Sequence, residues 1–268
     1  MTIPPDTGAE AFQRITNVSR ETICDYQTWY NLLTHWNKKI NLVSSNTIHN
    51  YWLRHVLDSH QLFNLAPFKN EKLAQNWLDL GSGAGFPGLA IALSLKHGAA
   101  PETVSETVNV TLVEATGKKC NFLRAVIREL GLPATVVQAR VEDLPAKPCD
   151  IITARAFAPL PKLLEYSLPF WSVDKSRPTI AIFPKGRGWK DEVDAAQNHW
   201  DFSYEAVDSQ TDDEAKILIV SGLARKKALS CDETDKNGNV LTRGEERESA
   251  TGNVSKGEEG VSPAGKIL

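Results

Sequence analysis

The clearest chemical signal in the sequence lies at residues 79–88, where DLGSGAGFPG directly follows a short apolar run. Glycine adopts backbone angles that other residues resist, and its missing Cβ lets the main chain approach a ligand closely. A helix that begins after such a turn points its N-terminal N–H groups and the positive end of its dipole at the same spot. The pattern therefore predicts a cofactor-binding loop; the alternative is a purely structural turn.

The spacing of the glycines separates two classes of cofactor. Dinucleotide-binding folds use G-x-G-x-x-G, which would put the third glycine at position 86, where this chain has Phe86. The observed G-x-G-x-G spacing instead resembles the Rossmann-like, class I methyltransferases that use S-adenosylmethionine (SAM). In that resemblance the loop wraps the methionine part of the cofactor, which implies contacts from Gly81, Ser82, Gly83 and Gly85.

Acidic residues follow the next two apolar runs. Glu114 ends the second run, and the segment Arg140-Val141-Glu142 comes after the third. The resemblance implies that Glu114 binds the ribose hydroxyls and that the loop with Val141 and Glu142 holds the adenine. Carboxylates accept well from hydroxyls and from an exocyclic amine. The alternatives are a helix-capping acid for Glu114 and a solvated acid for Glu142.

Short apolar runs alternate with helical patterns through the middle of the chain. The runs, which we expect to be strands, lie at 77–80, 110–113, 135–137, 151–153, 179–182 and 217–220. The clearest helix between them is 117–130, with apolar residues at i, i+3, i+4 and i+7 and a glycine directly after it. This alternation predicts an α/β fold with a doubly wound, mostly parallel sheet covered on both faces.

Amphipathic patterns before the sheet predict an N-terminal helical extension, with helices over 19–39 and 47–63 and Ser19 as the first N-cap. The last 40 residues hold 8 acidic and 5 basic side chains and no aromatic residue, so we expect them to be disordered. The predicted organisation is a frayed N-terminus (1–18), a helical extension (19–66), a SAM-binding methyltransferase domain (67–228) and an acidic tail (229–268).

Composition excludes several other classes of protein. No apolar run approaches the roughly 18 residues of a membrane-spanning helix, and the first residues do not resemble a signal peptide, so we expect a cytoplasmic protein. The 4 cysteines are widely spaced and the 6 histidines show no ligand spacing, which predicts reduced thiols and no metal site. With 30 basic and 33 acidic side chains, binding to nucleic acid would require a local basic patch.

The residues at the strand ends also limit which chemical groups could accept the methyl group. The fourth run ends in TARAF at 153–157, without the Asp/Asn-Pro-Pro-aromatic motif of many amine methyltransferases, and Cys149 precedes that run, where a pyrimidine C5 nucleophile is not expected. No general base stands out. Guanine N7 carries a lone pair and no proton, so its methylation needs alignment and desolvation but no base. Arg155 is a candidate contact to the base or cofactor, and otherwise a structural ion pair.

Beyond the glycine loop, the chain resembles a known family over about residues 19–225. The matching segments are WNKKINL at 36–42, RHVLDS at 54–59, the glycine loop at 79–88, RVE at 140–142, RAF at 155–157 and FPKG at 183–186. Together they are similar to the small-subunit ribosomal RNA guanine-N7 methyltransferases (RsmG, also called GidB). The combination is far more specific than the glycine loop alone.

The resemblance implies methylation of one guanine in 16S rRNA in the bacterial cytoplasm, with the rRNA or the small ribosomal subunit as partner. We expect the protein to be a monomer. It places cofactor contacts at Gly81, Phe86, Val141, Glu142 and Arg155. The basic positions that would face RNA are Lys38, Arg54, His55, Lys185, Arg225, Lys226 and Lys227. For each of these the alternative is a solvated surface residue, and His55 could equally hold the helices against the sheet. Phe157 or Phe86 would stack on the target guanine.

Three rival functions remain open from sequence alone. A SAM-dependent methyltransferase of small molecules would have a closed, mostly apolar pocket, with the N-terminal helices as a lid. A non-catalytic RNA-binding protein could keep the fold, although an intact glycine loop argues against it. A nicotinamide dehydrogenase is disfavoured by Phe86 at the third glycine position.

Overall fold

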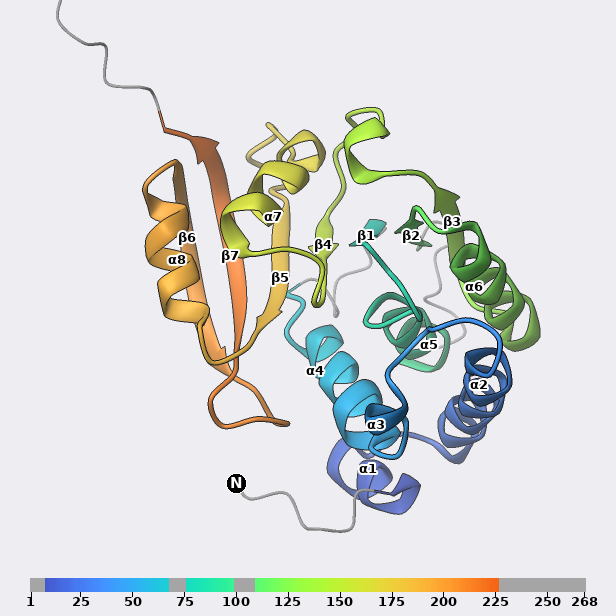
Figure 1. Cartoon of the computed structure of the whole chain (residues 1–268). Helices are drawn as coiled ribbons and strands as arrows, with labels where there is room; N and C mark the ends of the chain where they lie inside the picture. The colour runs from blue at the N-terminus through green and yellow to red at the C-terminus, as the bar shows by residue number, and fades with distance from the viewer. Residues whose placement is uncertain (1–7, 68–75, 99–108, 227–268) are drawn as a thin grey trace, which may run out of the picture. The chain divides into compact units, whose positions relative to one another are not determined.

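The computed structural model describes residues 8–67, 76–98 and 109–226, and within them the chain forms a seven-stranded sheet (Figure 1). The strand order is β3-β2-β1-β4-β5-β7-β6, with parallel pairing from β3 to β5 and antiparallel pairing of β7 with both β5 and β6. The strands are β1 Asn76–Leu80, β2 Asn109–Glu114, β3 Ala134–Gln138, β4 Ile151–Thr153, β5 Ile180–Lys185, β6 Trp200–Asp208 and β7 Lys216–Arg225.

Helices precede the sheet and connect its strands. The helices are α1 Ala9–Thr16, α2 Arg20–Asn37, α3 Ser45–Ile48, α4 Asp58–Asn64, α5 Gly88–Gly98, α6 Gly117–Leu130, α7 Leu160–Ser167 and α8 Trp189–Gln197. A π-helix spans Tyr51–Leu57, and short 3-10 turns span Val141–Asp143 and Leu168–Phe170.

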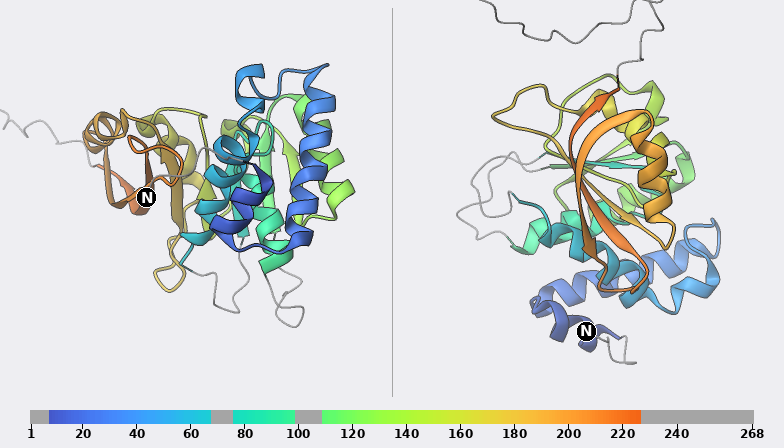
Figure 2. Two further views of the ribbon diagram at one scale, coloured as in Figure 1. Left: turned by 90° about the horizontal axis from the view of Figure 1, so that it is seen from below. Right: turned by 90° about the vertical axis from the view of Figure 1, so that its left-hand side faces the viewer.

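Alternating strand residues supply two hydrophobic cores, one on each face of the sheet. Trp77 and Leu112 pack with the N-terminal helices, α5 and α6, whereas Leu78 and Val113 pack with α7 and α8. Figure 2 shows the N-terminal helices (blue) grouped away from α8 (orange). The predicted doubly wound α/β sheet with an N-terminal helical part is therefore confirmed.

Local signals account for several element boundaries. Ser19 caps α2, because its side chain accepts a hydrogen bond from the Thr22 amide, and Gly131 ends α6 in the left-handed conformation with φ 58°. Both boundaries agree with the sequence. The sequence reasoning missed β6, although apolar residues at 200, 202, 204 and 206 alternate there with polar residues at 201, 203 and 205.

Two predictions about the N-terminal region are wrong. The chain is not frayed over 9–16, because α1 buries Phe12 against Tyr26 and Trp52. The helix predicted over 47–63 is instead divided into α3, the π-helix and α4. The apolar spacing indicates helical structure, but it does not distinguish one regular helix from a helix with a π-helical turn.

The described residues all belong to one compact unit that ends at Lys226, and α2 contacts both α5 and α6. The predicted tail (229–268) lies outside the described residues. Among the residues that are described, no helix combines the length and the apolar character required to span a membrane.

Candidate functional site

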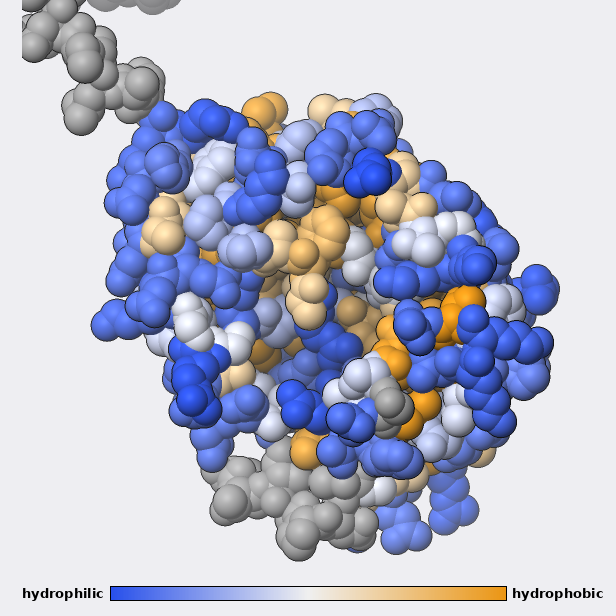
Figure 3. Space-filling view, in the orientation of Figure 1, coloured by the Kyte–Doolittle hydropathy of each residue, from blue (hydrophilic) through white to orange (hydrophobic). Residues whose placement is uncertain are grey.

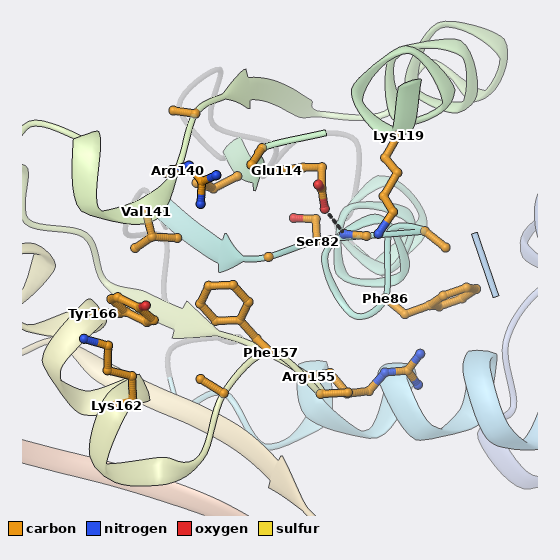
Figure 4. A pocket seen from close by; sticks show the side chains of 18 of the residues that line it. Ser82, Phe86, Glu114, Lys119, Arg140, Val141, Arg155, Phe157, Lys162 and Tyr166 are labelled. Atoms are coloured by element: carbon orange, nitrogen blue, oxygen red, sulfur yellow. Dashed lines mark hydrogen bonds between the residues drawn. The ribbon is translucent and has the colours of Figure 1, made fainter. Parts of the chain in front are cut away.

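A cavity of about 600 Å³ opens at the carboxyl ends of the parallel strands (Figure 4). This is the edge where open α/β sheets bind their ligands. Figure 3 shows this face of the molecule hollowed near its centre, with hydrophobic side chains exposed among hydrophilic ones. We call this the glycine-loop cavity. Of the nine predicted cofactor contacts, its wall includes eight: Gly81, Ser82, Gly83, Phe86, Glu114, Val141, Glu142 and Arg155.

The ninth predicted contact, Gly85, does not line the cavity. Its φ is 94°, and a Cβ added to it would lie 2.3 Å from Leu89 Cδ1 on α5. Gly83 differs, since φ is 57° and an added Cβ would meet only the Gly81 carbonyl oxygen, at 3.8 Å. Gly85 therefore permits the close approach of loop and helix, whereas Gly83 presents bare main chain to the cavity.

Glu114 ties the end of β2 to the glycine loop. Its Oε2 accepts a hydrogen bond from the Gly83 amide at 3.0 Å, drawn dashed in Figure 4, and its Oε1 accepts from the Thr116 amide at 2.7 Å. Thr116 is the N-cap residue of α6, so the carboxylate of Glu114 does bind the start of that helix, as the helix-capping alternative predicts. The same carboxylate also lines the cavity, and it is 7% exposed.

Asp79 supports the loop from below, a role that the sequence reasoning missed. Its side chain is fully buried, accepting from Thr153 Oγ1 at 2.9 Å and from the Gly88 amide at 3.2 Å. Burial raises the pKa of Asp79 to about 6, opposed by the hydrogen bonds from Ser82, Thr153 and Gly88. Its position at the start of the DLGSGAGFPG motif was the available signal.

The far wall of the cavity comes from the 3-10 turn after β3 and from α7. Val141 is buried there, while Glu142 is exposed. Hydrogen bonds from its own amide and from the Tyr166 hydroxyl hold the pKa of the Glu142 carboxyl below its usual value. Lys162 and Tyr166 also line this wall, and sequence reasoning missed both. Their i, i+4 spacing on the helix after β4 was the only signal.

Phe86 does not lie free at the cavity. It is 4% exposed and stacks on Trp29 and His55, with ring centroids 4.4 Å and 4.9 Å away. The prediction that Phe86 stacks on a guanine is therefore corrected: its ring anchors the glycine loop to α2 and the π-helix. The prediction that His55 faces RNA is corrected as well, because His55 is 7% exposed and burial lowers its pKa to about 4.

Arg155 joins the sheet to the helical extension. Its Nη1 donates to the Arg54 carbonyl and to Asp58 Oδ2, both at 2.9 Å, and its Nη2 lies 3.1 Å from His55 Nδ1. Figure 4 shows its side chain extending toward Phe86, where the guanidinium carbon is 5.1 Å from the ring centroid. The structural ion pair considered for Arg155 is thus present, at a residue that also lines the cavity.

Some of the predicted RNA-facing residues are accessible. Lys38 and Arg54 are exposed, and Phe157 is 36% exposed at the border of the glycine-loop cavity. Lys185 is not accessible in this way. It donates to the Ala158 carbonyl at 2.9 Å and to Glu192 at 2.8 Å, with 9% of its side chain exposed, so its charge is already paired inside the fold.

The remaining predicted basic positions lie at the other end of the sheet. In the antiparallel register of β5 and β7, Lys185 pairs with Lys216 and Ile180 pairs with Ser221. Arg225 and Lys226 follow Ser221, beyond the amino end of β5, and roughly 30 Å of extended strand separates Arg225 from Lys216. Both are exposed, but the structure does not bring them to the cavity. Lys227 lies outside the described residues.

The glycine-loop cavity fits an adenosyl cofactor. Its volume lies within the range of about 300–1,000 Å³ that small-molecule sites occupy. It offers bare main chain at Gly83, a carboxylate at the end of β2, and the apolar Val141 beside the third strand. The main chain and the carboxylate suit the polar parts of such a molecule, and the apolar wall suits its flat part.

Comparison with known proteins agrees with this architecture. A family model described as rRNA small subunit methyltransferase G (GidB) matches residues 22–217. Proteins named ribosomal RNA small subunit methyltransferase G are similar to this chain. The one from Hyphomonas neptunium is 41% identical over 81% of this chain and 95% of its own length. The one from Parvibaculum lavamentivorans is 40% identical over 82% and 92%.

Among solved structures, an O-methyltransferase from Bacillus cereus in complex with SAH has a TM-score of 0.51 at 13% identity, covering 80% of this chain and 96% of that one. This likeness concerns the fold alone. The family match spans every residue that lines the glycine-loop cavity. The chain therefore belongs to the ribosomal RNA small subunit methyltransferase G family.

Proposed function

We propose that this protein transfers the methyl group of SAM to N7 of one guanine in the RNA of the small ribosomal subunit. The substrate is the 16S rRNA, free or within the subunit, and the reaction takes place in the bacterial cytoplasm. The proposal rests chiefly on one observation: the family match covers the complete wall of a cavity built on the glycine loop.

SAM, when bound, supplies a methyl group on a positively charged sulfonium. The chain's residues position this donor: the bare main chain at Gly83 admits it closely, and Glu114 and Val141 bound the cavity along β2 and β3. Phe86 and Asp79 hold the loop in place from behind, through the stack on Trp29 and the hydrogen bond to the Gly88 amide. Prealigned reactants remove much of the entropic barrier of a bimolecular reaction.

The acceptor chemistry suits a site without a general base. Methyl transfer to N7 would use the lone pair of the base and leave the electron pair of the broken bond on the sulfur, so it would release no proton. The carboxylate of Glu142, with its lowered pKa, is a weak base, and Asp79 is buried beneath the loop and lines no part of the cavity. The Cys149 thiol, whose pKa burial raises to about 12, is unsuited to act as a nucleophile.

Chemical mapping of 16S rRNA tests the proposal. Borohydride and aniline cleave RNA at N7-methylguanosine, and primer extension locates the break. We expect one cleavage site that disappears on deletion of the gene and returns with the intact gene. An unchanged pattern in the deletion strain would refute the assignment to 16S rRNA, and methylation of a small molecule by the purified protein would favour the rival function.

A further inference from the structure

A second cavity, of about 690 Å³, adjoins the glycine-loop cavity. The two share the segment 155–159, which follows β4 and includes Phe157. The other walls of the second cavity come from the region between α3 and α4, from the end of β5 and from the hairpin between β6 and β7. No predicted cofactor contact except Arg155 lines this second cavity.

Asp58, the first residue of α4, joins three of these walls. Its Oδ2 accepts from Arg155 Nη1 at 2.9 Å, which fixes the shared segment. Its Oδ1 accepts from Thr211 Oγ1 at 2.9 Å, which fixes the hairpin. Gln61, one turn later on α4, supports the same contact, because its Oε1 accepts from the Gln210 amide at 2.9 Å.

The shared segment is held in a strained form. Ala156 has a φ of 51°, a value that residues with a Cβ rarely adopt, and it lines both cavities. Such strain persists where the surroundings determine the conformation, and it often marks a functional position. Both sequence neighbours of Ala156 are held in place: the guanidinium of Arg155 binds Asp58, and the ring of Phe157 packs against Gly81.

We propose that the second cavity takes the acceptor guanine nucleotide, extruded from its RNA, and that Asp58 is the positioning residue for this site. The inference rests on the proposed function and deepens it. A base in this cavity would lie across the shared segment from the donor, and Phe157, which is 36% exposed and borders both cavities, is the aromatic residue at that boundary.

The charges on the walls suit a guanine nucleotide. Asp212, on the hairpin, is exposed at the cavity; its Oδ1 accepts from the Glu214 amide at 3.0 Å, and its other oxygen matches an N1–H or N2–H donor of guanine. That edge of the base is distinct from N7. Arg54 lines the cavity with an exposed side chain that can neutralise a phosphate.

Filling the cavity tests the site. Gly186 lines it, and a Cβ added there would meet nothing within 4 Å, so Gly186→Leu places a side chain in open space. Gly188 is the matched control: a Cβ there also meets nothing within 4 Å, but it lines neither cavity. We expect G186L to lower kcat/KM for unmethylated 16S rRNA about tenfold or more, with unchanged SAM affinity and melting temperature, and G188L to behave as wild type.

Removing the charge of Asp58 tests the positioning role. Asp25 is the control, since it pairs with Lys96 and His97 at similar exposure, 20% against 19% for Asp58, away from both cavities. We expect D58N, which loosens the hold on Arg155, to lower kcat about tenfold, and D25N to keep the wild-type kcat. If Asp58 had only a structural role, D58N and D25N would instead show the same loss of melting temperature and the same loss of activity as each other.

The outcomes separate the two proposals. If wild-type protein methylates 16S rRNA but folded G186L shows wild-type kinetics, the acceptor site is elsewhere and the inference is overturned. An Asp58 variant with wild-type kcat and KM would overturn the positioning role. If the wild-type protein itself transfers no methyl group to 16S rRNA, the proposed function fails first.

Discussion

Two glycines of the same loop should respond differently to alanine, because only one of them borders the cavity. In Gly83→Ala the new methyl group meets no atom closer than 3.8 Å, so the cost is the left-handed backbone alone, about 1–2 kcal/mol. In Gly85→Ala the new Cβ would lie 2.3 Å from Leu89 Cδ1 and 3.1 Å from Leu89 Cβ. A rotamer change of Leu89 can move Cδ1 away, but Leu89 Cβ is fixed to α5, so a tight contact of 3.1 Å remains.

The expected magnitudes follow from these contacts. Gly85→Ala adds an overpacking cost of about 1–3 kcal/mol to the backbone strain, which gives a loss of about 2–5 kcal/mol in the free energy of unfolding. Gly83→Ala should stay folded, but its methyl group borders the glycine-loop cavity, and we expect SAM affinity to fall about tenfold or more.

A matched control separates strain from loss of the site. Gly131 ends α6 with φ 58°, close to the 57° of Gly83, and an added Cβ there meets nothing within 4 Å. Gly131→Ala should therefore cost the same 1–2 kcal/mol or so in urea denaturation, yet bind SAM as wild type does in a calorimetric titration. The reasoning is refuted if Gly85→Ala is as stable as Gly83→Ala, or if Gly83→Ala keeps the wild-type affinity.

Two further predictions concern pH and RNA. Burial lowers the pKa of His55 and of His60 to about 4, so the unfolded state binds more protons between pH 4 and 6.5, and the free energy of unfolding should rise by a few kcal/mol as the pH increases through this window. Asp79, with its pKa raised to about 6, opposes this rise because its carboxyl stays protonated to higher pH in the folded state than in the unfolded state. Asp79→Asn should therefore steepen the dependence of the unfolding free energy on pH, measured by urea denaturation. An unchanged slope would contradict the raised pKa of Asp79. Arg54→Ala should weaken binding of 16S rRNA and reduce the slope of log K against log salt concentration by about 0.7–0.9. Arg225→Ala, at the far end of the sheet, should change neither quantity. Equal effects of the two variants in a filter-binding assay would show that RNA covers both ends of the sheet.

Much of the fold could be predicted because its signals are local. The strands of the parallel sheet are short apolar runs, and the sequence of α6 shows both an amphipathic pattern and the Gly131 that ends the helix. The π-helix and α1 were harder, since their form depends on packing: Phe12 is buried only because Tyr26 and Trp52 are there to cover it. Strand β6 carried a local signal as well, an alternation of apolar and polar residues over 200–206, which the sequence reasoning did not use.

The cavity residues divide in the same way. Eight of the nine predicted cofactor contacts line the glycine-loop cavity, because parallel strands place successive strand ends at one edge of the sheet. The basic residues were less predictable. A lysine has the same sequence signature whether it is solvated, as Lys38 is, or paired inside the fold, as Lys185 is with Glu192.

The sequence by itself determined the class of the fold, the glycine loop that lines the cavity and the family, since these depend on residue types at short, fixed spacings. Tertiary structure alone decided that Phe86 and His55 are stacked and buried, and that Gly85 allows the loop to approach α5 closely. It also decided that Asp58 joins Arg155 to Thr211. The physical reason is sequence separation: 97 residues separate Asp58 from Arg155 and 153 separate it from Thr211, and only the folded sheet brings these partners within hydrogen-bonding distance.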